Sequence, residues 1–321
     1  MAVLLPLSGS LATAAAPVRD GLLAGYYGES RRRPEISFYD TAGSASGAVE
    51  AYDKAVAEGN DFVVGPLGRD EVSTLFQRGT LPVPMLALNR GNVQPPPGHA
   101  SFSLSPDDEG TAAAEYLIAR GVGRVLVIAS EEESQRRAVA AFRARLAERG
   151  ASAEVTSEGT VDFTPFAAKD GGPDAIYLAV KGPSARALMP RLTLAGLAGK
   201  PRVATSHLVS GTGKPVDDRV LDGIAFPTEP WSAHPVRGLP SAASAAAILP
   251  NAKGGAARLF AFGHDAWLIA AYLEALANST QGLPGATGQL QIDGVGYVQR
   301  TPAWATFSGG TQMPLGDATQ R

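Results

Sequence analysis

The sequence contains no cysteine, which excludes disulfide bonds, thiolate metal sites and cysteine nucleophiles together. No apolar run reaches the ~18 residues that a membrane-spanning helix needs. Residues 1–7 are too short for a signal peptide and lack its charged start and cleavage site, so we expect them to form a core strand. We expect any targeting segment to lie upstream of residue 1.

The sequence also lacks a large excess of either basic or acidic residues. The net charge is −3, which gives no basic surface for nucleic acid or for an anionic membrane. The longest basic run, residues 31–33, follows a helix-like stretch. We predict that it is a solvated helix end, where cations oppose the negative end of the helix dipole.

Short apolar runs bounded by Gly and Pro alternate with segments of helical period, which predicts parallel sheets with crossover helices. The predicted strands of a first series are 3–7, 35–39, 62–65, 85–88 and 101–104, and those of a second are 124–129, 175–179, 202–206 and 223–226. Predicted helices cover 48–58, 69–77 and 184–198, a stretch around 15–26, two stretches ending near residues 120 and 150, and a long one across 262–276. Residues 227–255 are irregular, with room for a short helix at 242–248, and the tail holds short antiparallel strands at 289–292, 297–299 and 303–307.

Two such series predict two α/β lobes, each built on a doubly wound parallel sheet. Ligands of these sheets bind outside the carboxyl ends of the strands, and two lobes with these ends facing one another would enclose a cleft. The loops after the strands then supply the candidate residues for a ligand or a partner. They are Ser8, Gly9, Ser10, Gly65, Pro66, Leu67, Asn89 and Arg90 in the first lobe, and Ser130, Glu131, Lys181, Ser206 and His207 in the second. For each of them an ordinary loop role is the alternative.

Enzyme signatures fail on spacing. Gly121 and Gly123 precede a strand instead of following one, and the segment 211–214 lacks the earlier glycine of a phosphate loop. The segment 43–47 has alanine where a nucleophile elbow needs serine. The histidines show no metal-ligand spacing; they are His99, His207, His234 and His264. We therefore predict no catalytic residue, no metal, no cofactor and no enzyme activity.

Several segments taken together resemble the LppC family, the outer-membrane lipoproteins that activate penicillin-binding proteins. The opening LLPLSG at 4–9 and VRDGLLAGYY at 18–27 are similar to the start of that family's binding-protein-like domain. FSLSPDDE at 102–109 is similar to its crossing into the second lobe. Further similar segments are VVGPL at 63–67 with the Glu-Val pair at 71–72, PMLALN at 84–89, AFGHDAW at 261–267 and GQL at 288–290. The joint order of these segments, which cover most of the chain, carries the resemblance.

The resemblance implies a type I periplasmic-binding-protein fold, with lobe 1 formed by residues 1–105 and 228–288 and lobe 2 by 106–227 and 289–321. It also implies a periplasmic, outer-membrane lipoprotein that regulates peptidoglycan synthesis and cell shape. Its partner would be a class A penicillin-binding protein, a bifunctional peptidoglycan synthase, and it would touch the membrane only through a lipid anchor upstream of this chain. The sequence departs from the family in lacking the lipobox cysteine and the helical-repeat half that precedes this domain in some members.

A solute receptor for an amino acid or a cell-wall fragment is the alternative function. Such a receptor for a free amino acid needs hydroxyl donors for the ligand carboxylate, usually from Ser and Thr in the loops after the third and fourth strands. Here these loops are 65–69 and 89–91, which contain neither residue. Backbone amides and Arg90 remain as donors for an anion, so this difference disfavours a free amino acid but leaves a larger ligand open.

Overall fold

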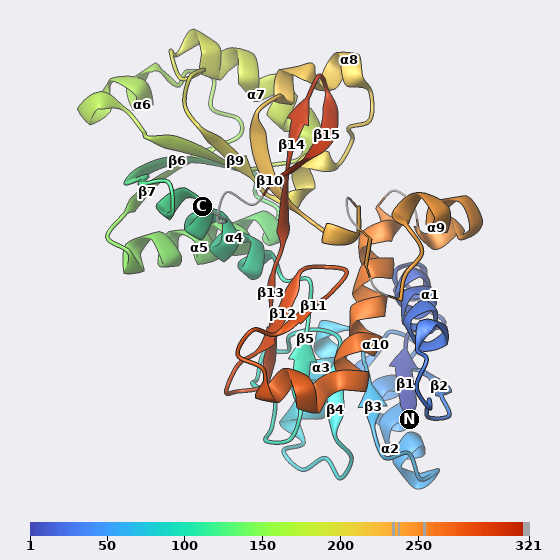
Figure 1. Ribbon diagram of the computed structural model, residues 1–321. Helices are drawn as coiled ribbons and strands as arrows, with labels where there is room; N and C mark the ends of the chain where they lie inside the picture. Colours follow the sequence, from blue (N-terminus) through green and yellow to red (C-terminus); the bar gives the residue numbers. More distant parts are fainter. Residues whose placement is uncertain (233–234, 237, 253–254, 317–321) are drawn as a thin grey trace. The chain divides into compact units, whose positions relative to one another are not determined.

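The computed structural model describes residues 1–232, 235–236, 238–252 and 255–316 (Figure 1). The chain forms two compact units, each of which is described by itself. Unit 1 comprises Met1–Ser105 and Glu229–Thr301, and unit 2 comprises Pro106–Thr228 and Pro302–Arg321. Among the described residues, none of the helices combines the length and the apolar character that crossing a membrane requires.

Unit 1 is built on an eight-stranded sheet with the order β11-β12-β13-β5-β4-β3-β1-β2. Its parallel part consists of β1 (Ala2–Leu5), β2 (Ser37–Asp40), β3 (Val63–Val64), β4 (Met85–Ala87), β5 (Ala100–Phe102) and β13 (Tyr297–Thr301). Two antiparallel strands, β12 (Gln289–Ile292) and β11 (Leu283–Pro284), extend it beyond β13. Most of these strands are buried on both faces, as near-continuous apolar strands of a covered parallel sheet are.

Helices cover both faces of this sheet, and successive residues of β1 show how. Val3 and Leu5 pack against α1 (Ala12–Gly28) and α10 (Ala256–Asn278). Ala2 and Leu4 point to the opposite face and pack against α2 (Ala45–Ala57) and α3 (Arg69–Gln77), because side chains alternate along a strand. A further short helix, α9 (Ala242–Ile248), packs beside α10 in a small cluster around Trp231.

The helices α1 and α10 lie side by side in unit 1 (Figure 1) and approach closely at two glycines. A Cβ atom added to Gly21 would lie 1.9 Å from the carbonyl oxygen of Phe260, and one added to Gly263 would lie 1.9 Å from that of Val18. Each helix therefore presents a residue without a side chain to the backbone of the other, and this is what lets the two backbones come so near.

Unit 2 repeats the plan with a seven-stranded sheet of order β15-β14-β10-β9-β8-β6-β7. The parallel strands are β6 (Arg124–Ala129), β7 (Ser152–Ser157), β8 (Ala175–Ala179), β9 (Arg202–Ala204) and β10 (Ile224–Thr228). The antiparallel strands are β14 (Ala303–Ser308) and β15 (Thr311–Leu315). The helices α4 (Pro106–Ile118) and α5 (Glu133–Glu148) cover one face, and α6 (Thr164–Ala168) and α7 (Gly182–Leu194) cover the other, with the short α8 (Pro215–Asp218) after β9.

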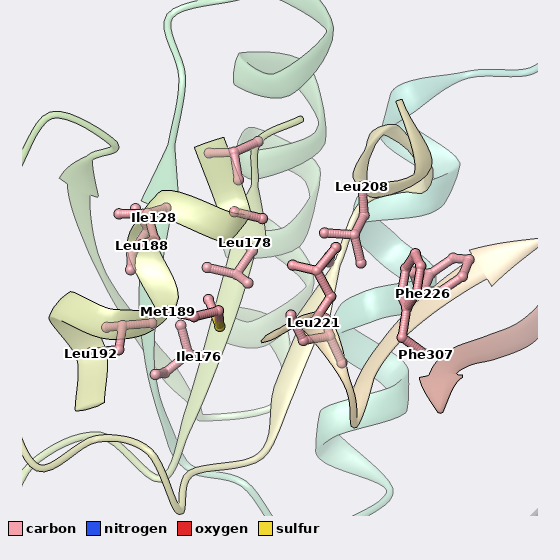
Figure 2. Packing of buried hydrophobic residues seen from close by; sticks show 14 of the residues in the cluster. Ile128, Ile176, Leu178, Leu188, Met189, Leu192, Leu208, Leu221, Phe226 and Phe307 are labelled. Atoms are coloured by element: carbon pink, nitrogen blue, oxygen red, sulfur yellow. The ribbon is translucent and has the colours of Figure 1, made fainter. Parts of the chain in front are cut away.

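The core on the α7 face is shown in Figure 2. Leu188, Met189 and Leu192 of α7 pack on the side chains of β6 and β8. Their neighbours in the same buried cluster include Ile128, Ile176, Leu178, Leu208, Leu221, Phe226 and Phe307. The last of these comes from β14, so the C-terminal hairpin completes this core after the chain has left unit 1 and returned.

Most predicted elements are confirmed, several with the same bounds: β6, β8, β12, α3 and the short helix α9. The sequence-based prediction missed β7, β11, β15, α6 and α8. It also placed residues 289–301 in the second lobe and residue 228 in the first. The structure differs, because β12 and β13 pair with the sheet of unit 1 next to β5, and because Thr228 ends β10 of unit 2.

Candidate functional site

The candidate residues of unit 1 lie at the carboxyl edge of its sheet. Strand β1 has β2 on one side and the series β3, β4, β5 on the other, so the order reverses between β1 and β3. In doubly wound sheets this reversal marks the usual position of a ligand. Ser8, Gly9 and Ser10 follow β1, Gly65–Leu67 follow β3, and Asn89 and Arg90 follow β4.

Asp40, at the end of β2, organises the loop after β1. Its Oδ1 accepts hydrogen bonds from the backbone nitrogens of Leu7 (2.8 Å), Ser8 (3.2 Å) and Ala42 (2.8 Å), and its Oδ2 accepts one from the Ser8 hydroxyl (2.6 Å). The Ser8 hydroxyl and these N–H groups lower the pKa of the Asp40 carboxyl. Gly9 has a φ of 80°, and a Cβ there would lie 2.6 Å from the Ala42 carbonyl oxygen. Ser8 is thus held by the end of the neighbouring strand, and Ser8, Gly9 and Ser10 are all exposed.

The loops after β3 and β4 are tied to each other through Asn89. Its Nδ2 donates to the Leu67 carbonyl oxygen at 2.9 Å, and its Oδ1 accepts from the backbone nitrogen of Arg90 at 2.9 Å. Gly65 has a φ of 105°, and a Cβ there would lie 2.0 Å from the Leu4 carbonyl oxygen. The Gly65–Pro66 peptide is cis, and Pro66 is buried. Gly65 and Pro66 therefore shape the backbone at this edge of the sheet, and the Asn89 side chain is already engaged within the unit.

Arg90 extends along the hairpin formed by β12 and β13 of the same unit. Its guanidinium carbon lies 5.2 Å from the centre of the Tyr297 ring, and its Nη2 donates to the Gln299 side chain at 3.4 Å. Both partners are on β13. Arg90 was predicted to act as a donor at the carboxyl edge, and its guanidinium group is already in contact with β13.

A buried carboxylate that the sequence did not single out for this site lies beneath the edge. Glu71, only 1% exposed, accepts hydrogen bonds from the Thr41 hydroxyl and from the backbone nitrogen of Gly68, both at 2.6 Å. Burial raises its pKa, and these hydrogen bonds oppose the rise. In sequence Glu71 looks like any acid in the first turn of a helix, so only its burial distinguishes it.

The candidate residues of unit 2 also follow its strands at the carboxyl edge, with the reversal between β6 and β8. The buried Ser130 follows β6, and the exposed Glu131 comes next. Lys181 precedes α7 and forms an ion pair with Glu132 at 2.6 Å. The loops after β6 and β8 are therefore joined by a salt bridge that is almost half exposed on both sides.

The loop after β9 is anchored by Glu109 of α4. This carboxylate is 4% exposed and accepts hydrogen bonds from the Ser206 hydroxyl (2.8 Å) and backbone nitrogen (3.0 Å). Next to Ser206, the buried Thr205 donates its hydroxyl to the Gln135 side-chain oxygen at 3.1 Å. His207 is half-buried in the 3-10 helix η2 (Ser206–Val209). Glu109, Gln135 and Thr205 were absent from the sequence-based candidates, because nothing in the sequence pairs them.

The histidines serve separate local environments. His99 accepts a hydrogen bond from the Met85 nitrogen at 3.2 Å, and burial lowers its pKa. His264 is buried beside Asp265, and His234 lies outside the described residues. In the part of the chain that the structure describes, no three His, Cys, Asp or Glu side chains gather in a way that could hold a metal ion.

Two surface depressions are lined by residues other than the candidates, although one includes Asp40, which accepts hydrogen bonds from Ser8. One, of about 410 Å³, lies in unit 2 between Arg124, Glu154, Phe166 and Lys169. The other, of about 470 Å³, follows β2 and α2 of unit 1 and includes Asp40 and Glu50. None of the predicted site residues lines either of these two depressions.

Comparison with known families decides where this chain belongs. The model of the family described as LppC putative lipoprotein matches residues 1–158 and 166–310. The chain is a member of the LppC family. The resemblance noted from the sequence segments is thereby confirmed.

Two relatives in this family carry the name Penicillin-binding protein activator LpoA. The protein from Photobacterium profundum is 28% identical over 349 residues, which cover 96% of this chain and 56% of the relative. The protein from Mannheimia succiniciproducens is 26% identical, over 98% of this chain and 55% of the relative. The chain thus spans about half the length of these curated relatives.

Solved structures share the LppC chain's two-unit fold. The C-domain of LpoA (YraM) from Haemophilus influenzae, described as a regulator of PBP1A, superposes with a TM-score of 0.85 at 22% identity, covering 98% of this chain and 99% of that one. A putative branched-chain amino acid ABC transporter protein from Chromobacterium violaceum gives a TM-score of 0.77 at 28% identity, covering 95% and 99%. The predicted class, two α/β lobes with mostly parallel sheets, is confirmed.

Proposed function

We propose that this chain is the periplasmic domain of an outer-membrane lipoprotein and that it activates a class A penicillin-binding protein by direct contact. The observation that carries the proposal is the match of nearly the whole chain to relatives named penicillin-binding protein activator. The description of the Haemophilus influenzae C-domain as a regulator of PBP1A adds to it, since that domain has a similar length and the same fold.

The chemistry of the carboxyl edges disfavours capture of a solute. A solute receptor needs polar groups that are available to the ligand. Ser8 is bound to Asp40, Asn89 to the Leu67 carbonyl group and Ser206 to Glu109. We therefore propose that these residues hold the loops in place, without a catalytic role and without a cofactor.

The test combines binding and activation. The purified chain would be added to a detergent-solubilised class A penicillin-binding protein from the same organism, with binding measured by biolayer interferometry and glycan polymerisation followed with fluorescent lipid II. We expect saturable binding and a faster reaction. The Chromobacterium violaceum protein, which has the same fold, is the control and should do neither. No binding by this chain, when the full-length lipoprotein binds in the same assay, would overturn the proposal.

A solute receptor is the second candidate function, and the 28% identity to the Chromobacterium violaceum transporter protein favours it. A ligand at 100 times its Kd stabilises the folded state by about 2.7 kcal/mol. We expect no thermal shift with leucine, isoleucine or valine, because the hydroxyls of Ser8 and Ser206 are engaged by carboxylates of their own units. A shift of several degrees with one of these amino acids would make the receptor function the better conclusion.

A further inference from the structure

The arginine run 31–33 lies between α1 and β2 and contacts both α1 and α10, which are neighbours in unit 1 (Figure 1). The Nη1 of Arg33 donates to the carbonyl oxygens of Tyr26 (3.2 Å) and Tyr27 (3.4 Å) in the last turn of α1. This confirms the predicted helix-end role for Arg33. That role does not explain the rest of the run.

Arg31 is held by a second set of contacts. It forms an ion pair with Glu29 at 3.0 Å, and its guanidinium carbon lies 3.9 Å from the centre of the Tyr272 ring on α10. The Tyr272 hydroxyl donates to the same Glu29 carboxylate at 3.0 Å. Hydrogen bonds from Arg31, first of all, lower the pKa of Glu29 to about 2, so this carboxylate is ionised throughout the neutral range and offsets the charge of Arg31.

Two exposed side chains of the group take part in no hydrogen bond or ion pair within the described part of the chain, although the Tyr27 ring packs edge-on against Tyr26, with ring centres 5.1 Å apart. Arg32 is exposed between the two anchored arginines. Tyr27 is 70% exposed, and the Arg33 guanidinium carbon lies 5.5 Å from its ring centre. The backbone around both is fixed by the bonds of Arg31 and Arg33, and by the Tyr26 hydroxyl, which donates to the Pro34 carbonyl group at 2.9 Å. Binding would therefore lose little backbone conformational entropy at these residues.

The charge of this surface is opposite to that of the whole chain. The chain carries a net charge of −3, whereas Arg32 and Arg33 remain positive after Glu29 has offset Arg31. Exposed tyrosine and arginine are the side chains enriched at protein interfaces and among their energetic hot spots. A positive, aromatic surface fits an acidic face of a protein partner, which would be attracted to this spot.

We propose that Tyr27, Arg32 and Arg33 form a docking surface for an acidic face of the penicillin-binding protein. The proposal rests on the function proposed above and names the surface that the partner contacts. It lies on α1 and the following loop, apart from the carboxyl-edge loops, which follow β1, β3 and β4.

The test compares two charge reversals of equal size. Arg32→Glu changes the proposed surface, and Arg143→Glu changes an exposed arginine of α5 in unit 2. Both variants should keep the thermal midpoint of the wild type, because both side chains are exposed. We expect Arg32→Glu to weaken binding to the penicillin-binding protein by about tenfold or more, mainly by slower association, and Arg143→Glu to leave it unchanged.

Tyr27→Ala and the salt dependence give a second measurement. Tyr27→Ala should also weaken binding, whereas Tyr27→Phe, which keeps the ring, should bind nearly as the wild type does. Raising the salt concentration should weaken wild-type binding more than that of Arg32→Glu. If the wild type binds and Arg32→Glu binds equally well, the docking surface is wrong while the proposed function stands. If the wild type does not bind, both are wrong.

Discussion

Asp265 and Thr287 are joined by two hydrogen bonds to one carboxylate oxygen, from the Thr287 backbone nitrogen at 2.7 Å and from its hydroxyl at 2.6 Å. The other oxygen accepts a bond from the Ala286 nitrogen at 2.7 Å and lies 3.2 Å from His264 Nδ1. Asp265 and Thr287 are completely buried. Helix α10 therefore fixes the turn that leads into β12, and with it the hairpin that extends the sheet of unit 1.

Asp265→Asn tests this attachment. The side-chain amide of this variant has an N–H group where the carboxylate has an acceptor oxygen. This N–H group would face another N–H or O–H donor, so that buried donors would be left without an acceptor. We expect the free energy of unfolding to fall by about 3 kcal/mol, as measured by urea denaturation. Asp222→Asn is the matched control, because the Asp222 carboxylate also accepts from two backbone nitrogens, those of Gly309 and Gly310, at a partly exposed turn. The free energy of unfolding of Asp222→Asn should fall by less than about 1 kcal/mol. An equal fall in Asp265→Asn and Asp222→Asn would contradict the role of burial.

The close approach of α1 and α10 gives a second prediction. Gly21→Ala and Gly263→Ala each place a methyl group 1.9 Å from a carbonyl oxygen of the other helix, and only a shift of the helices can relieve this. We expect each variant to lose about 3 kcal/mol. Gly199→Ala is the control, since nothing lies within 4 Å of a Cβ there. Thermal denaturation would compare the stabilities of the three variants. A Gly21→Ala variant as stable as Gly199→Ala would show that the two helices can move apart with little loss of stability.

Which strands the sequence predicts depends on how they are buried. The strands β6 and β8 are apolar runs covered on both faces, so their bounds follow from composition. The missed β7 lies at the sheet edge and reads SAEVTS, with most of its residues exposed. Edge strands bury too little to need apolar side chains, and the missed β15, which contains Pro314, is of the same kind.

For the candidate site, the sequence predicts positions better than partners. Topology alone places Ser8, Asn89 and Ser206 after strands, because a doubly wound sheet gathers these ends at one edge. Their partners Asp40 and Glu109 are distant in sequence and look like an ordinary strand end and a first-turn acid. The pairing depends on how the elements pack in space, and no spacing along the chain encodes it.

The raised pKa of Glu71 predicts a pH dependence of stability. In the folded state Glu71 stays protonated at pH values above its ordinary pKa of 4.5. Between pH 4.5 and the folded pKa, the folded state therefore binds more protons than the unfolded state does. Stability from this group is therefore complete below pH 4.5 and falls as the pH rises through the folded pKa. In Glu71→Gln, an amide can accept from the Gly68 nitrogen and donate to Thr41 without titrating. Urea denaturation across pH 4 to 8 should show the wild type losing stability relative to this variant, and parallel profiles would contradict the prediction.

Two buried tyrosines, Tyr177 and Tyr52, differ in the environment of their hydroxyl groups. The Tyr177 hydroxyl has no hydrogen-bond partner among the described residues, and burial raises its pKa well above the ordinary value. The Tyr52 hydroxyl donates to the Val83 carbonyl group at 2.8 Å and accepts from the Val83 nitrogen at 3.1 Å. Phenylalanine at 177 keeps the ring stacked on Phe142, whose centre is 4.2 Å away, and removes a polar group that burial has stripped of water.

We therefore expect Tyr177→Phe to leave the free energy of unfolding unchanged or to raise it slightly. Tyr52→Phe should lower it by about 1–2 kcal/mol, because the Val83 backbone groups lose their partner. Urea denaturation of the two variants, each at the same pH as the wild type, measures the difference directly. A loss in Tyr177→Phe as large as that in Tyr52→Phe would mean that the Tyr177 hydroxyl is satisfied in solution, with an ordered water as the simplest partner in so enclosed a position.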